Sequence, residues 1–387
     1  MLDSLPLTER QRELAGYWLP ALAAGVVAWM VFLTFGKTPF IRALALAAPI
    51  SVIALTLRRF GGLLAFTGGL ALAFSPGFWS QTGGGEPTTL TTIVAVLIVA
   101  GIAGAAFIWF GKRPGLGLTI GLVIFTILFW ALVGTNRSLR LTTFFSAGLI
   151  FVLMNALFSA NPRPDEPAQA TSRLRPYHTW GLLLFLALGV LNDPLFTLLA
   201  PATILGLILS RSSLKPWHCL IIFIILVVGL RGIAVEYLSS TWWLYPAAQA
   251  EALGIRVPYM MADGWRDGSR WVVLINLVIG QFTVIGMLLG VIGLARFARW
   301  YPPLGVVTMV AYAAYALFGL IYFGKNSAVL LLPLLMIQTI WMTYAVFTFS
   351  QWLQKSLQSS GTLVRWAAPG VFVLMPLVMF LRIAGAL

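Results

Sequence analysis

Charged residues are scarce in this chain of 387 residues, since only 9% are Asp, Glu, Lys or Arg, whereas 60% are hydrophobic. A water-soluble fold of this composition would leave large apolar patches in contact with water. Apolar runs of about 18 to 25 residues recur along the chain, each long enough to cross a hydrocarbon core of about 30 Å as a helix. They lack the alternation of a transmembrane β-barrel. The sequence therefore predicts an all-α polytopic membrane protein.

Residue types that bind metals and cofactors are also rare. The single cysteine, Cys219, begins an apolar run and excludes an intrachain disulfide. The two histidines, His178 and His218, lie on separate turns and lack the spacing of metal ligands on one helix. The chain contains no Walker loop, no G-x-G-x-x-G after a strand and no C-x-x-C. The sequence therefore predicts no metal site and specifies no cofactor.

Basic residues outnumber acids, which gives a net charge of +14, yet the 25 Lys and Arg are scattered in ones and twos at the ends of apolar runs. This distribution is typical of charges that set membrane topology, and it argues against a nucleic-acid partner. With the N-terminus in the cytoplasm, every cytoplasmic connection receives basic residues. We therefore predict a multi-pass protein of the cell (inner or cytoplasmic) membrane with its N-terminus inside.

The apolar runs divide the chain into about thirteen predicted spans. They lie near 15–35, 40–57, 60–78, 90–110, 115–134, 141–159, 179–192, 194–210, 217–235, 271–295, 302–323, 327–349 and 366–386. Residues 1–14 are expected to form a juxtamembrane helix, and 15–387 a single transmembrane domain. Two connections exceed simple turns, namely a proline-rich cytoplasmic linker at 160–178 and an outer loop at 236–270.

All eleven acids fall at predicted span ends or in loops, which counts against a proton-coupled pump or a channel with a charged pore. Six of them face outward in this topology: Glu86, Asp193, Glu236, Glu251, Asp263 and Asp267. With Arg231 they would line a polar pocket at the outer membrane surface. Arg231 is a candidate for holding a lipid phosphate, because its planar fork matches phosphate oxygens. The position of Arg231 would equally suit a structural arginine, whose long side chain extends to the membrane interface or pairs with Glu236.

The stretch SPGFWSQTGGGEPTTL at 75–90 interrupts two apolar runs with glycines and one acid. Pro76 is expected to end a span, and Glu86 with Pro87 to open the returning helix, where the helix dipole favours an acid. Large aromatics near such ends are typical of the membrane interface. The predicted interface aromatics are Trp79, Trp242, Trp243 and Trp265.

Several motifs in order resemble one family. ALAFSPGFWSQTGGGEPTTLTTIVAVLIVAG is similar to the third and fourth spans of the GT-C superfamily of multi-pass glycosyltransferases, and most similar to the protein O-mannosyltransferase-like family. LFLALGVLNDPLFTLLAPATILGLIL resembles its Gly-Asn-His-Leu-Thr span pair, with Asn192 kept and Asp193 where histidine is usual. VVGLRGIAVEYL and MMADGWRDGSRWVVLINLVIGQF resemble its arginine-bearing span end and outer-loop signature. The resemblance runs from about residue 40 to 350 and implies a GT-C-like fold.

One departure from the family pattern bears on activity. The resemblance implies a long outer loop after the first span, whose acid acts as general base and helps to hold the donor phosphate through a metal. In this chain VFLTFGKTP is followed at once by FIRALALAAP, so Lys37 and Thr38 stand where that loop belongs. A general base must reach the hydroxyl that it deprotonates, and this short basic turn supplies none.

Two functions remain open from the sequence, with a transporter as a further alternative. In the first, the chain is a scaffold or accessory subunit, a pseudoenzyme that binds membrane lipids and other integral membrane subunits. In the second, it is a glycosyltransferase that moves a sugar from a polyprenyl-phosphate donor with a divalent metal. The candidate base is then Glu86 or Asp267, and the donor phosphate is held by Arg231, Glu236, Asn192 and Asp193.

Overall fold

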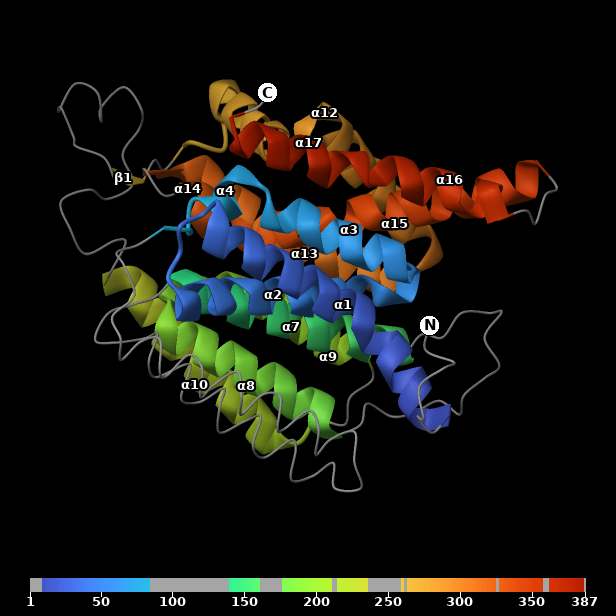
Figure 1. The fold of residues 1–387 in the computed structure, drawn as a ribbon. Coiled ribbons are helices and arrows are strands. Elements are labelled where there is room, and N and C mark those ends of the chain that lie inside the picture. Colours follow the sequence, from blue (N-terminus) through green and yellow to red (C-terminus); the bar gives the residue numbers. More distant parts are fainter. Residues whose placement is uncertain are drawn as a thin grey trace.

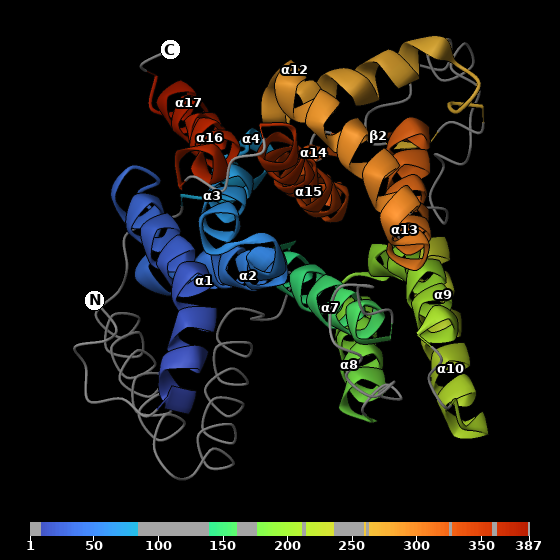
Figure 2. The same ribbon diagram turned by 90° about the vertical axis from the view of Figure 1, so that its right-hand side faces the viewer.

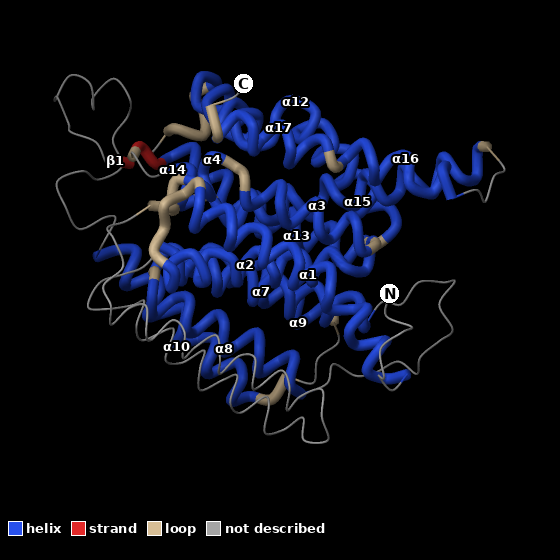
Figure 3. Tube along the Cα trace, viewed as in Figure 1, coloured by secondary structure: helices blue, strands red, loops and turns tan. Residues whose placement is uncertain are grey.

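The computed structural model describes residues 9–83, 139–160, 176–210, 214–235, 259–260, 263–324, 327–357 and 362–385. These ranges form helices and one short antiparallel pair of strands, β1 (Tyr259–Met260) and β2 (Tyr322–Phe323) (Figures 1 and 3). The helices are α1 (Glu9–Thr34), α2 (Phe40–Leu57), η2 (Arg58–Phe60), α3 (Gly62–Ala73), α4 (Pro76–Trp79), α7 (Leu139–Ala160), α8 (Pro176–Asn192), η3 (Pro194–Leu199), α9 (Ala200–Leu209), α10 (Pro216–Ile233), α12 (Gly268–Trp300), α13 (Pro302–Ile321), α14 (Ser327–Leu330), α15 (Leu332–Ser356), α16 (Thr362–Phe372) and α17 (Leu374–Ile383).

Seven helical segments in the described part of the chain are long and apolar enough to cross a membrane. They are Arg42–Phe60, Leu139–Ala160, Pro216–Ile233, Gly268–Trp300, Pro302–Ile321, Leu332–Ser356 and Trp366–Ile383. Four shorter apolar segments accompany them: Trp18–Thr34, Gly62–Ala73, His178–Asn192 and Pro194–Leu209. The all-α, multi-pass architecture predicted from the apolar runs is confirmed. The spans expected at 90–110 and 115–134 lie outside the described residues, so the number of about thirteen stays a prediction.

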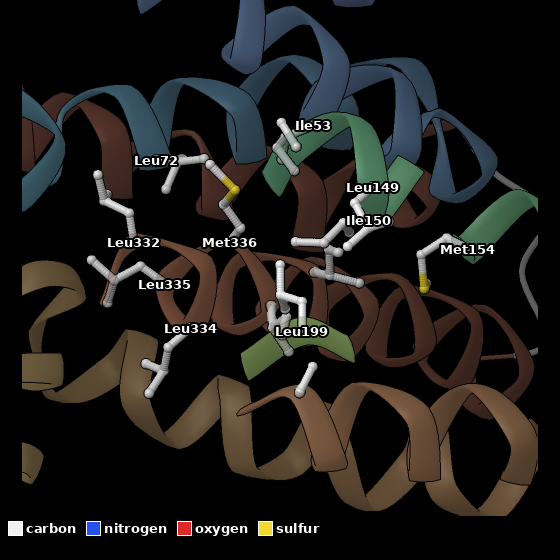
Figure 4. Packing of buried hydrophobic residues seen from close by; sticks show 14 of the residues in the cluster. Ile53, Leu72, Leu149, Ile150, Met154, Leu199, Leu332, Leu334, Leu335 and Met336 are labelled. Carbon is white, nitrogen blue, oxygen red and sulfur yellow. The ribbon is translucent and has the colours of Figure 1, made fainter. Parts of the chain in front are cut away.

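Helix α15 is the centre of the core, because 89% of its apolar window is buried inside the protein. Met336 of α15 lies beside Leu72 of α3 in the close view of the packing (Figure 4). Helix α10, in contrast, has only 22% of its window buried, and Figure 2 places it at the edge of the bundle away from α16 and α17. An apolar helix with a largely uncovered surface suits contact with lipid or with another membrane chain.

Helices α12 and α15 approach closely because three glycines of α12 lie against α15. A Cβ added at Gly290 or Gly293 would overlap Gln338 or the Trp341 carbonyl, and one added at Gly286 would stand 3.0 Å from the sulfur of Met342. Small residues at helix crossings let backbones approach, which is how helices without a hydrophobic driving force gain packing energy in a membrane. The Gln338 amide also donates to the Gly286 carbonyl at 3.2 Å, which adds a polar tie to this crossing.

The described connections fall into two groups at opposite ends of the bundle. At one end α1 finishes and α2 begins, α3 is followed by α4, α8 meets η3, α12 starts, and the β1–β2 pair lies beside the end of α13 (Figure 1). We call this the α4 end. The α1–α2 turn comprises only residues 35–39, and Lys37 adopts a left-handed φ of 45°. The structure thus has the short turn expected there.

Several helices differ in detail from the predicted spans. Residues 9–14, part of the predicted juxtamembrane helix at 1–14, are helical and continuous with α1. Pro76 does not end the preceding span, which stops at Ala73; it occupies the first position of α4, where its missing N–H costs nothing. Helix α12 bends at Thr283, whose φ of 65° and ψ of 171° are not helical.

Candidate functional site

The predicted site residues that the structure describes all lie near the α4 end of the bundle. They are Trp79, Asn192, Asp193, Arg231, Trp265 and Asp267. Glu86, Glu236, Trp242 and Trp243 lie outside the described residues, as does Glu251. A common location at one end of the helices is the arrangement expected of residues that share one membrane surface, and the contacts below define how each is used.

Asp193 is fully buried and holds the turn between α8 and η3. One carboxylate oxygen accepts the N–H of Leu195 at 3.0 Å, so Asp193 is the N-cap of η3. The other oxygen accepts the hydroxyl of Thr142 in α7 at 3.3 Å. The Asn192 amide donates to the same Thr142 hydroxyl at 2.9 Å. Asn192 and Asp193 are therefore joined through α7, in a buried polar tie between three helices.

Arg231 lies on α10, the helix that packs against η3. A Cβ at Gly229 or Gly232 of α10 would overlap Thr197 or Pro194 of η3, so these two elements touch closely. Arg231 itself is exposed. The helix that carries Arg231 is thus next to the Asp193 turn, and its guanidinium stands on the outside of the bundle.

Asp267 is the N-cap of α12 and is partly exposed. Its carboxylate accepts the Ser269 hydroxyl at 2.7 Å and the Ser269 N–H at 2.8 Å. These two hydrogen bonds lower the pKa of the Asp267 carboxyl below its usual value. A general base works best when its pKa lies near the working pH, so this environment makes Asp267 a weaker base than a free carboxylate.

Arg270, in the first turn of α12, binds the end of α13 and was not singled out by the sequence. Its side chain is buried and donates to the carbonyls of Leu320 at 3.0 Å, Gly319 at 2.8 Å and Tyr322 at 2.6 Å. Its guanidinium carbon also stands 3.6 Å from the ring centroid of Phe323. Arg270 therefore satisfies the terminal carbonyls of α13 and anchors β2 to α12.

A second polar cluster surrounds Gln81, immediately after α4. Arg140 of α7 donates to the Gln81 carbonyl through Nη2 at 2.9 Å and Nε at 3.2 Å. The Gln81 side-chain oxygen accepts the hydroxyl of Thr143 at 3.3 Å. In the next layer, Gln281 of α12 accepts the N–H of Gly77 at 2.6 Å. No local pattern marks these residues, although a polar side chain just inside an apolar run is the signal that would have drawn attention to them.

The two described interface aromatics differ in exposure. Trp79 is half-buried and its ring lies 5.9 Å from that of Phe32 in α1. Trp265 is 47% exposed, and the guanidinium of Arg266 stands 4.6 Å from its ring centroid. The Trp271 indole donates to the Trp265 carbonyl at 2.8 Å. An exposed indole beside an arginine is the arrangement typical of the boundary between lipid tails and headgroups.

The residues that would hold a divalent metal do not come together in the described part of the chain, where no group of three His, Cys, Asp or Glu side chains could bind one. His218 lies at the opposite end of the bundle, buried, with its ring 3.9 Å from that of Trp217. Its Nδ1 accepts the Lys215 N–H at 3.0 Å, which closes the start of α10. His218 thus helps to cap the N-terminus of α10.

Comparisons of the chain with protein-family models, with curated proteins and with solved structures find no match. The resemblance to GT-C glycosyltransferases therefore rests on the sequence motifs alone.

Proposed function

We propose that the chain is an integral membrane scaffold or accessory subunit, built on a degenerate GT-C-like fold and part of a larger complex of membrane proteins. In this proposal it spans the cell (inner or cytoplasmic) membrane about thirteen times, with its N-terminus in the cytoplasm and the α4 end outside. Its partners are membrane lipids and other integral membrane chains.

The observation that carries the proposal is the use of the polar side chains at the α4 end. Asp193 is fully buried and bound to Leu195 and Thr142, and Asn192 is bound to Thr142. Asp267 is bound to Ser269. Polar groups arranged in this way tie helices to one another, whereas a catalytic carboxylate must have an oxygen facing its substrate.

The α1–α2 turn also supports a structural role. It comprises residues 35–39, where the resemblance implies a long loop with the base. Loss of the base together with its loop removes positioning as well as proton transfer, and proton transfer alone is worth about 10²- to 10⁴-fold in rate. The largely uncovered apolar surface of α10 offers an area for neighbouring membrane chains.

Purification of the full chain from its native membrane in mild detergent tests the proposal. We expect other membrane chains to copurify in fixed stoichiometry, as counted by quantitative mass spectrometry. Recovery of a lone monomer that transfers sugar from a polyprenyl-phosphate donor would instead establish the enzyme. In that case the residues that take part in sugar transfer can be identified with the variants Glu86→Gln, Arg231→Ala and Asp267→Asn. Because asparagine is also a good N-cap, loss of turnover in Asp267→Asn would show that the carboxylate acts in catalysis and not only in helix capping.

A further inference from the structure

Positive groups gather where α2 begins, at the α4 end of the bundle. The N-cap of α2 is Pro39, and no side chain caps this helix start. A helix N-terminus carries partial positive charge and is normally accompanied by an acid. Here the first turn of α2 contains no acid and instead carries Arg42, which is exposed. The charge of Arg42 and the helix dipole therefore add, and together they favour an anion at this point.

Arg140 of α7 brings a second cation to the same place. It is half-buried on α7, which packs along α2, and it is bound to Gln81, close to Gly83, whose N–H donates to the Thr38 hydroxyl just before α2 at 2.9 Å. Within the described part of the chain the Arg140 side chain donates to the carbonyl of Gln81, a neutral acceptor that does not compensate its positive charge. Among the described residues no acid is bonded to either arginine, and an anion that bridges the two would stabilise both charges.

Gln81 supplies a third group, a buried donor without an acceptor. Its side chain is 6% exposed, and its carbonyl side is engaged by Thr143. The Nε2 of the same amide is buried and makes no hydrogen bond. A buried polar group without a partner is destabilising and is uncommon in folded proteins. A ligand that carries an acceptor oxygen would satisfy this donor next to the two arginines.

We propose that Arg42, Arg140 and the Gln81 amide, with the start of α2, form a binding site for a phosphate group. Arginine forks match phosphate oxygens, an uncapped helix start donates N–H groups to them, and the amide supplies a further neutral donor. The phosphate is either the headgroup of an anionic lipid or a free phosphate, because both present the same oxygens. This site differs from the Arg231 position predicted from the sequence, and it does not depend on the function proposed above.

Binding to the purified full chain in neutral detergent tests the site, with native mass spectrometry used to count bound lipid. We expect phosphatidylglycerol to bind more tightly than zwitterionic phosphatidylcholine. Arg140→Gln should weaken phosphatidylglycerol binding about tenfold or more, as expected for loss of a charge-assisted hydrogen bond. Arg42→Gln should act in the same direction, and since Arg42 is exposed it serves as the variant that folds. Arg266→Gln, which removes an exposed arginine stacked on Trp265 at the same end, should leave binding unchanged.

Gln81→Glu distinguishes a ligand site from a merely structural cluster. The new carboxylate would remove the unpartnered donor and compensate the two arginines, so we expect a higher melting temperature together with loss of phosphatidylglycerol binding. If these residues only stabilised the fold, Gln81→Glu would raise the melting temperature without loss of phosphatidylglycerol binding.

Inorganic phosphate identifies the source of the ligand. If it raises the melting temperature of the wild type but not of Gln81→Glu, the site takes free phosphate; if only phosphatidylglycerol does so, the site takes the headgroup. The proposal would be overturned if phosphatidylglycerol and phosphatidylcholine bound equally well. It would also be overturned if Arg266→Gln and Arg42→Gln lost the same amount of phosphatidylglycerol binding, or if Gln81→Glu bound this lipid as well as the wild type does.

Discussion

Replacing Arg270 by methionine would remove the guanidinium that joins α12 to the end of α13 while keeping most of the side-chain volume. Three carbonyls, those of Gly319, Leu320 and Tyr322, lose their charged donor in buried surroundings. A buried acceptor left without a partner costs about 1–3 kcal/mol, and the cation–π contact with Phe323 adds about 0.5–2 kcal/mol.

These terms are not additive, because the backbone relaxes and water reaches some of the carbonyls. We therefore expect Arg270→Met to lower the free energy of unfolding by about 3–5 kcal/mol, at the upper end for a single substitution. The control is Arg266→Met, four residues earlier, where the exposed guanidinium only stacks on Trp265 and the loss should be about 0.5–1 kcal/mol.

Unfolding of the purified variants in mixed micelles, followed by circular dichroism against increasing sodium dodecyl sulfate, gives both free energies. Arg270→Lys is a useful third variant, since an ammonium keeps the charge but cannot reproduce the fork that reaches three carbonyls. A difference of less than about 1 kcal/mol between Arg270→Met and Arg266→Met would refute the view that Arg270 anchors α13, because it would place both arginines in the range of ordinary surface substitutions.

Three further predictions concern the buried acid, the exposed acid and the helix crossing. Asp193→Ala should destabilise the chain by about 2 kcal/mol through loss of the η3 cap and of the bond from α7, whereas Asp193→Asn keeps capping ability and should cost less in the same unfolding assay. Because the folded-state pKa of Asp267 is lowered, its contribution to stability is present above the unfolded pKa of about 3.9 and is lost as pH falls through the folded pKa. The melting temperatures of wild type and Asp267→Ala should therefore converge as the pH falls below about 4. A difference in melting temperature that stays constant with pH would contradict this prediction. Gly293→Ala should weaken the α12–α15 crossing, because its Cβ overlaps the Trp341 carbonyl, while Gly370→Ala in α16 meets open space and should stabilise the chain by about 0.5–1 kcal/mol; equal melting temperatures of the two variants would count against the tight crossing.

The positions of the helices were predictable because membrane helices need long apolar runs, and length alone identifies them. The predicted span at 141–159 lies within α7, Leu139–Ala160, and that at 302–323 matches α13, Pro302–Ile321, followed by β2. Breaks inside the runs were not predictable. Thr283 bends α12 without a proline, two residues after Gln281, whose side chain binds Gly77 more than two hundred positions earlier. Such a bend is set by tertiary contact, which no local pattern contains.

The candidate site was predictable only in outline. Ionisable residues near span ends drew attention to Asp193 and Asp267, since charge is rare in such a chain. The partner that joins Asp193 to α7 is neutral and distant in the chain, since Thr142 reaches it from 51 residues away. Gln81 was not predicted at all, and Arg140 reaches it from 59 residues away. Neutral polar residues are common at helix ends, so their significance appears only when the fold brings them together.

The sign of the charge at the α4 end links the loop that the resemblance implies to the proposed phosphate site. The resemblance implies an acid after the first span, which would attract a metal cation and act as base. In its place stand Lys37 in a turn with a left-handed φ, an uncapped helix start and Arg42, with Arg140 nearby. A positive field of this kind repels a metal cation and attracts an anion directly. In the proposed degenerate GT-C-like fold, the residues that stand in place of the implied loop thus belong to the proposed phosphate site, where a phosphorylated lipid would be held without being turned over.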